Sequence, residues 1–166
     1  MEAAYCIHCI DEIFVGRGFV NMTKKYFWGG YNRKLFFWFN TAAHICNITS
    51  IIIYGALGGA WVVIPLSISW VFVTNGFWHV LATAIFKEYS PGLGTSALYW
   101  LIIYLIMRYG DIRLSYYICS IITGTIITSL MIGSLFIVRR KTHRVSDLKV
   151  RVTKNDRLVD DGEGVA

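Results

Sequence analysis

The chain has 166 residues, of which 55% are hydrophobic and only 16% charged, and its mean hydropathy is +0.52. Soluble domains carry about 25% charged residues, so this composition points to a lipid bilayer. The length allows four spans with short loops and a tail, and excludes a separate soluble catalytic domain. The net charge is +6, and eight of the sixteen Lys and Arg residues follow Val138. This placement favours a basic membrane flank over nucleic-acid binding, and we expect no nucleic-acid partner.

The first predicted element is a short amphipathic helix over residues 3–14. Its apolar residues keep helical spacing, while His8, Asp11 and Glu12 share another face at i, i+3 and i+4. A helix of this length covers only about half of the hydrocarbon core. We therefore expect it to be interfacial or half-inserted, with its polar edge turned toward the rest of the protein.

The remaining chain predicts an all-α integral membrane bundle. A connector rich in glycine, aromatic and basic residues suits the lipid headgroup layer. Four apolar stretches then predict four transmembrane helices, at residues 35–57, 61–86, 93–107 and 116–138. The predicted segments are the N-terminal helix with its connector (1–34), the four-helix transmembrane domain (35–138) and a charged cytoplasmic tail (139–166).

Orientation follows from the Lys and Arg residues in the short flanks of the spans. Basic residues before residue 35 and after residue 138 predict a multi-pass protein with both the N- and the C-terminus in the cytoplasm. This topology places the N-terminal helix and the end of the second span on the same side of the membrane.

A polar pair interrupts the second apolar stretch. Asn75 and His79 are four residues apart, so they lie on one face of a helix. Polar groups at membrane depth are costly unless they are satisfied, so another part of the protein must meet them. Because the topology brings His8, Asp11 and Glu12 to the same side, we predict that these five residues form one polar site.

Three interpretations of this site stay open. His8, Asp11, Glu12 and His79 offer mixed nitrogen and oxygen ligands, which suit a divalent Zn, Fe or Mn ion. Without a metal, the same groups can act as acids and bases, because a carboxylate in apolar surroundings has a raised pKa. In a purely structural interpretation, the acids face water and Asn75 and His79 only hydrogen-bond between helices.

Other polar residues have weaker functional signals. His44 and Asn47 lie three residues apart in the first span, and we expect them to support the site indirectly or to join helices. Residues 89–92 are predicted to form a turn, which can lie at the mouth of the site. Cys6-x-x-Cys9 has the spacing of a metal or redox pair, but no second pair accompanies it.

Three short motifs, in this order, resemble the HXXEE-motif family of small bacterial membrane proteins: His8-x-x-Asp11-Glu12, Asn75-x-x-x-His79 and Tyr89-Ser-Pro-Gly-Leu-x-Thr95. The sequence departs from the family's motif at Asp11, where the motif has a glutamate that is one methylene longer. The resemblance implies a compact helical bundle in a bacterial inner membrane, with these polar residues gathered together. It does not imply a reaction.

Two functional hypotheses follow from the sequence. In the first, the protein is a membrane enzyme acting on a hydrophobic or lipid-like substrate, with catalytic roles for His8, Asp11, Glu12, Asn75 and His79. In the second, it is a non-catalytic subunit, chaperone or small transporter that binds a partner within a larger membrane complex.

Overall fold

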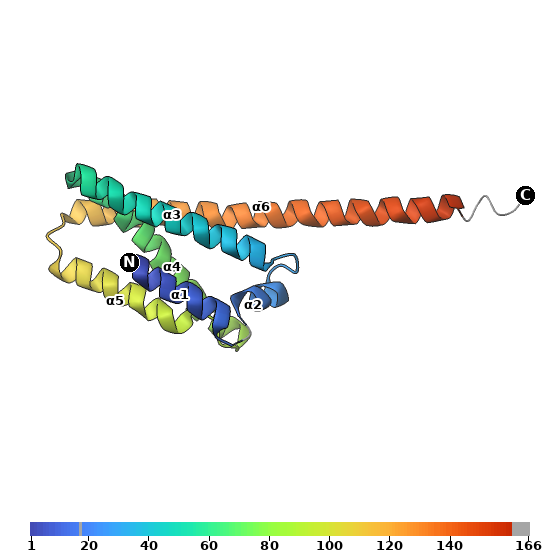
Figure 1. The fold of residues 1–166 in the computed structure, drawn as a ribbon, viewed down its shortest axis with the longest axis horizontal. Coiled ribbons are helices and arrows are strands. Elements are labelled where there is room, and N and C mark those ends of the chain that lie inside the picture. Colours follow the sequence, from blue (N-terminus) through green and yellow to red (C-terminus); the bar gives the residue numbers. More distant parts are fainter. Residues whose placement is uncertain (17, 161–166) are drawn as a thin grey trace, which may run out of the picture. The chain divides into compact units, whose positions relative to one another are not determined.

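The computed structural model describes residues 1–16 and 18–160, with side chains up to Arg140 except at residue 135. This part of the chain contains helices and no strands, which confirms the all-helical class (Figure 1). The elements are α1 (Glu2–Phe14), α2 (Phe19–Tyr26), α3 (Arg33–Leu57), the 3-10 turn η1 (Gly59–Val62), α4 (Val63–Phe86), α5 (Leu93–Tyr109) and α6 (Leu114–Asp160). Met1–Ser129 and Leu130–Ala166 form two separate units.

Three segments are long and apolar enough to cross a membrane: Arg33–Leu57, Gly59–Phe86 and Leu114–Arg140. These segments indicate a membrane protein. Local sequence explains where α3 begins and ends. The Asn32 side chain accepts a hydrogen bond from the Leu35 N–H at 3.0 Å, and Gly58 follows the last turn with a φ of 62°. The fourth apolar helix, α5, is shorter than these three segments.

Two boundaries differ from those expected. The connector contains a helix, α2, whose Met22 and Thr23 side chains are buried. In addition, α6 runs past residue 138 to Asp160, because the charged segment contains neither glycine nor proline and helical hydrogen bonding does not require apolar side chains. Residues 161–166 of the predicted tail lie outside the described residues.

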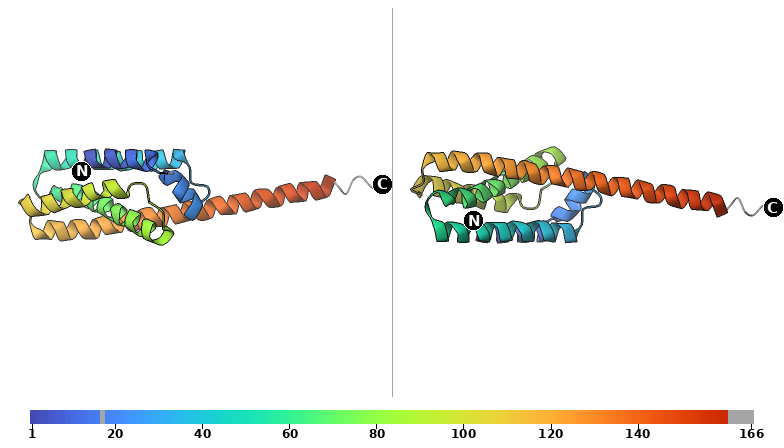
Figure 2. Two further views of the ribbon diagram at one scale, coloured as in Figure 1. Left: turned by 90° about the horizontal axis from the view of Figure 1, so that it is seen from below. Right: turned by 90° about the horizontal axis from the view of Figure 1, so that it is seen from above.

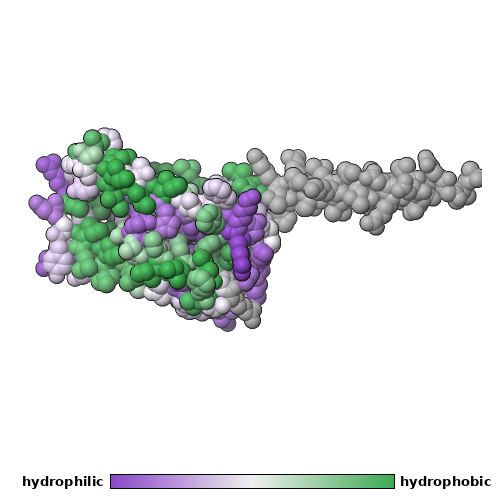
Figure 3. All heavy atoms as spheres, in the orientation of Figure 1, coloured by the Kyte–Doolittle hydropathy of each residue, from purple (hydrophilic) through white to green (hydrophobic). Residues whose placement is uncertain are grey.

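Helix α1 has its polar face inside and its apolar face outside. His8, Asp11 and Glu12 are buried, whereas Ile7 is 48% exposed and Phe14 is 76% exposed. The interpretation in which these acids face water is therefore wrong. The apolar residues of α1 continue the surface of the bundle, where long aliphatic and aromatic side chains are also exposed (Figure 3).

Side-chain contacts set α1 antiparallel to α3. Cys9 hydrogen-bonds to Asn40 at 3.3 Å, and Glu2 hydrogen-bonds to Asn47, about two turns further along α3. Figure 2 shows α1 running alongside α3. Helix α1 therefore begins beside the middle of the first candidate span and ends toward its start.

Stacked aromatic rings form the core beneath α1. The Tyr5 ring stacks on Phe72 of α4 with centroids 4.3 Å apart, and Phe72 stacks on Tyr99 of α5 at 5.6 Å. Tyr99 is fully buried and also contacts His8, at 5.1 Å between ring centroids. This core fixes the distances between α1, α4 and α5, and so positions the polar residues at its edge.

Candidate functional site

Three helices bring the polar residues of the site together. Helix α1 supplies His8 and Glu12, one turn apart on one face, and α4 supplies Asn75 and His79 with the same spacing. The third contribution comes from the turn between α4 and α5 and from the first turn of α5. The i, i+4 spacing on both α1 and α4 places two side chains of each helix on the same face, one turn apart.

The two imidazoles meet at the Glu12 carboxylate. Oε1 of Glu12 lies 3.5 Å from Nε2 of His8 and 3.3 Å from Nε2 of His79. The Asn75 amide nitrogen lies 3.1 Å from Nε2 of His8 and 3.3 Å from Nε2 of His79. Both histidines have no exposed surface. Two imidazole nitrogens, a carboxylate and an amide therefore converge on one enclosed point.

Hydroxyl groups bind the other nitrogen of each imidazole. The Thr95 hydroxyl lies 3.1 Å from Nδ1 of His8, and the Ser90 hydroxyl lies 2.9 Å from Nδ1 of His79. Thr95 donates its single hydrogen to Asp11 at 2.8 Å or to the Gly92 carbonyl at 3.2 Å, so it can only accept from His8. His8 therefore carries a proton on Nδ1, and the lone pair of its Nε2 faces the Asn75 amide and Glu12, where a metal ion could bind.

The buried Glu12 carboxyl lies between the two imidazoles. A carboxylate beside two imidazole nitrogens is a set of ligand atoms that suits a cation, either a proton or a metal ion. One ligand atom from each of His8, Glu12 and His79 falls within 4.8 Å of the other two.

A comparison with known proteins identifies the family of this chain. A sequence model described as "protein of unknown function with HXXEE motif" matches residues 1–107. The chain belongs to the HXXEE family. No curated protein and no solved structure matches the chain. The matched region ends within α5, so it contains every residue of the site described above.

The two acids of the HXXEE motif have different positions in the structure. Glu12 lies among the ligand atoms, whereas Asp11 lies behind His8 and accepts a hydrogen bond from the Thr95 hydroxyl. The sequence hypothesis had placed Asp11 among the metal ligands. The structure instead connects it to the site through Thr95, and its buried Oδ1 has no hydrogen-bond partner among the described residues.

A glycine in the turn before α5 allows the rings of His8 and His79 to lie close to the backbone of that turn. A Cβ at Gly92 would lie 2.6 Å from Cε1 of His8 and 2.9 Å from Nε2 of His79, closer than real Cβ contacts. The φ of Gly92 is also positive, at 97°, which favours glycine. Only a residue without a side chain fits here beside both rings.

Sequence reasoning missed several residues of the site. Ser90, Gly92 and Thr95 all lie in the third family motif, which was interpreted mainly as a turn, and that motif was the only signal for them. His44 and Asn47 were expected to support the site indirectly. They bind Glu2, a residue that the sequence did not single out, and form a separate cluster with it.

A half-open hollow of about 380 Å³ lies at the same end of the bundle. It is formed by the loop between α1 and α2, by α2 and by the turn between α4 and α5, and Pro91 joins its wall to the Ser90 and Gly92 positions of the site. An ion pair between Lys25 and Glu88, 2.5 Å apart, borders it. The residues lining the hollow are Gly16, Gly18, Asn21, Met22, Lys25, Glu88, Tyr89 and Pro91.

Proposed function

We propose that this HXXEE protein is an integral membrane enzyme whose divalent metal is held by His8, Glu12 and His79. One observation carries the proposal. Three potential ligand atoms on different turns converge within 4.8 Å in a buried site, and hydroxyl groups already bind the remaining nitrogens of both imidazoles. Hydrogen bonds of this kind to the far side of a histidine are typical of metal ligands, because they fix the ring and its tautomer.

The ligand set favours a catalytic metal over a structural one. Structural zinc sites usually have four protein ligands, whereas three protein ligands leave a position for water or substrate. Two histidines and one carboxylate suit Zn, Fe or Mn. When bound, such a metal supplies Lewis acidity at a dry site, where it polarises a polar group of the substrate.

We further propose that α1 lies in the membrane and that α5 is the fourth span. Exposed Ile7, Ile10 and Phe14 would be unfavourable in water but suit lipid, which supports insertion of α1. Helix α5 has 17 residues and a length of roughly 26 Å, which crosses a hydrocarbon core of about 30 Å with slight thinning. Four spans would place the start of α3 and the chain that follows the last span on the same side, the cytoplasmic side by the distribution of Lys and Arg.

The hollow beside the turn between α4 and α5 favours an amphiphilic substrate. Its wall combines Lys25, Glu88 and Asn21 with Met22 and Pro91, so it offers polar groups to a headgroup next to apolar surface. A lipid-like molecule can place its polar part there while its chain remains in the bilayer. We propose this class of substrate for the enzyme.

Metal analysis of purified protein tests the proposal. The protein is purified in mild detergent with a tag that contains no histidine, in a Cys6→Ser background that removes the cysteine of a second cluster described below. We expect one metal ion per chain, and loss of that metal in His79→Gln and in Glu12→Gln. Glu88→Gln is the matched control, because Glu88 lies at the edge of the hollow and should leave metal content unchanged.

Other results of this experiment would support other functions. A folded parent protein that binds no added Zn, Fe or Mn would remove the metal and leave acid–base chemistry by the same residues. If the protein instead purifies with a stoichiometric membrane partner, and membranes that contain the Glu12→Gln protein lose no activity, these two results together would support a non-catalytic subunit.

A further inference from the structure

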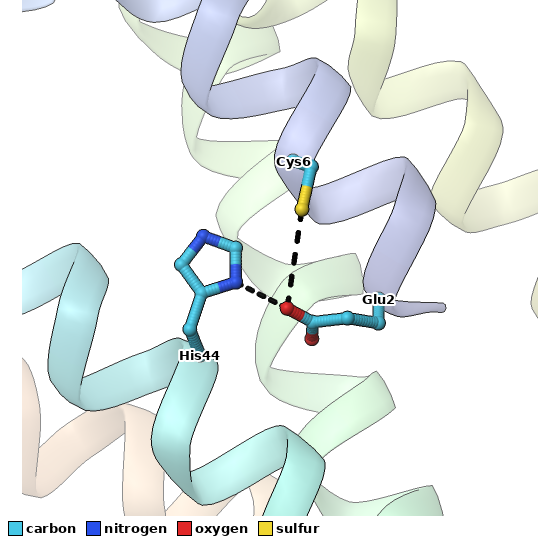
Figure 4. Close-up of side chains that lie close together, drawn as sticks. All are labelled: Glu2, Cys6 and His44. Carbon is cyan, nitrogen blue, oxygen red and sulfur yellow. Dashed lines mark hydrogen bonds and ion pairs between the residues drawn. The ribbon is translucent and has the colours of Figure 1, made fainter.

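A second cluster of metal-binding side chains lies on another face of α1. Glu2 and Cys6 are one turn apart, and His44 of α3 points at the same Glu2 oxygen as the Cys6 thiol (Figure 4). The Cys6 sulfur lies 4.0 Å from Oε1 of Glu2, and Nδ1 of His44 forms an ion pair with that oxygen. One ligand atom of each residue falls within 4.8 Å of the others.

We propose that Glu2, Cys6 and His44 form a second metal site, which binds a borderline or soft divalent ion such as Zn²⁺. A thiolate, an imidazole and a carboxylate are the three ligand types that zinc takes in proteins. The thiolate makes this site softer than the cluster of His8, Glu12 and His79, which contains no sulfur. The proposal does not depend on the proposed function, because no ligand is shared between the two clusters.

Neighbouring side chains hold the ligands in place. The Asn47 amide donates to the other oxygen of Glu2, and Asn47 is 1% exposed. The Tyr5 ring packs against the His44 ring, with centroids 4.4 Å apart. Cys9 lies 3.8 Å from Nε2 of His44 and also donates to Asn40, so the Cys-x-x-Cys pair flanks the imidazole on both sides. His44 is therefore fixed by contacts that leave Nδ1 facing Glu2 and Cys6.

The cluster lies at the surface of the protein and is only partly covered by other side chains. Cys6 is exposed, and the side chains of Glu2 and His44 are each 26% exposed. Figure 3 shows a hydrophilic patch within the apolar surface where the start of α1 meets α3. A carboxylate beside the middle of a candidate span is costly without a compensating cation. A metal at this position would supply that charge and would fasten α1, which carries His8 and Glu12, to α3.

Cobalt provides a probe that separates the two sites. A thiolate bound to Co²⁺ gives an intense sulfur-to-metal charge-transfer band, which nitrogen and oxygen ligands do not give. The experiment titrates Co²⁺ into purified His79→Gln protein under reducing conditions. We expect the band to develop with one equivalent, and added Zn²⁺ to remove it and to raise the melting temperature.

Three variants in that background decide the outcome. Cys6→Ser should abolish the band, and His44→Gln should weaken cobalt binding at least tenfold. Cys119→Ser, which removes an exposed cysteine of α6, is the matched control and should leave the band unchanged. The proposal is overturned if the parent shows no charge-transfer band, or if the band persists in Cys6→Ser. In the first case the cluster is a Glu2–His44 ion pair without metal.

Discussion

The Thr95 hydroxyl lies 3.1 Å from Nδ1 of His8, although the two residues are 87 positions apart in the chain. Because the same hydroxyl lies 2.8 Å from Oδ2 of Asp11, a chain of hydrogen bonds runs from a carboxylate through a hydroxyl to an imidazole. This chain sets which nitrogen of His8 faces Glu12. It also gives a role to Asp11, the acid of the HXXEE motif that does not lie among the ligand atoms.

Removal of the Thr95 hydroxyl should therefore weaken metal binding without removing a ligand. In Thr95→Val we expect a loss of affinity of about 10–100-fold, because the His8 ring loses the acceptor for its Nδ1 proton. Competition with a chelator measures the affinity. Thr95→Ser should restore most of it, and Thr125→Val, which removes a hydroxyl that bonds within α6, should change nothing. Equal affinity in Thr95→Val and the parent would contradict this role.

Substitution of Gly92 should close the site. In Gly92→Ala the new methyl group would fall within 3 Å of both histidine rings, so we expect at least a tenfold loss of metal affinity. Backbone strain alone costs about 1–2 kcal/mol at a positive φ. Gly59→Ala separates the two effects, because Gly59 also has a positive φ, 52°, but has open space around it. If both variants bind metal equally well, the close approach to the histidines is not what requires glycine.

Tyr99→Phe should not destabilise the protein. The Tyr99 hydroxyl is buried and has no hydrogen-bond partner among the described residues, and an unpaired buried hydroxyl lowers stability. We expect Tyr99→Phe to leave the free energy of unfolding unchanged or to raise it by about 1 kcal/mol, as measured by thermal unfolding in detergent. Tyr117→Phe is the control and should lower stability by a similar amount, because its hydroxyl donates to the Ile106 carbonyl at 2.9 Å. A large loss in Tyr99→Phe would indicate a partner in the native protein.

Close packing of α6 on α4 depends on Gly124. A Cβ there would lie 2.7 Å from the Ser67 carbonyl oxygen and 2.7 Å from Cβ of Trp70, and neither atom can move away without shifting α4. We expect Gly124→Ala to lower the free energy of unfolding by about 1–3 kcal/mol. Gly55→Ala in α3 meets nothing within 4 Å and should be neutral or slightly stabilising. Chemical or thermal unfolding of both variants, compared with the parent, measures the difference.

Helical periodicity predicted part of the site and missed the rest for physical reasons. The spacing of Asn75 and His79 was sufficient to place them on one face, and the cost of buried polar groups required a partner. Periodicity did not show which of the two acids, Asp11 or Glu12, lies among the ligand atoms. Adjacent residues point about 100° apart around a helix, so only the packing of α1 decides which acid faces His79 and which faces α5.

The hydroxyl partners were harder to predict than the ligands. Serine and threonine are common in apolar helices, where they usually bond to their own backbone, as Ser69 does to the Pro65 carbonyl. What distinguishes Ser90 and Thr95 is their contact with His79 of α4 and with His8 of α1, respectively. These contacts arise from the packing of the turn and of the start of α5, which local sequence does not encode. Glu2 was missed for the same reason, because its role depends on the antiparallel pairing of α1 with α3.

The inverted polarity of α1 has a consequence for biogenesis. His8 and Glu12 leave the ribosome with the first helix, but the Thr95 hydroxyl and the His79 imidazole that they meet belong to α5 and α4 and follow roughly 90 and 70 residues later. In the proposed membrane arrangement, the acidic edge of α1 lacks these partners until then, and an unpaired carboxylate in lipid is costly. We therefore expect stable membrane integration of α1 to follow the synthesis of α4 and α5, and a nascent chain that ends before Thr95 to hold α1 less stably.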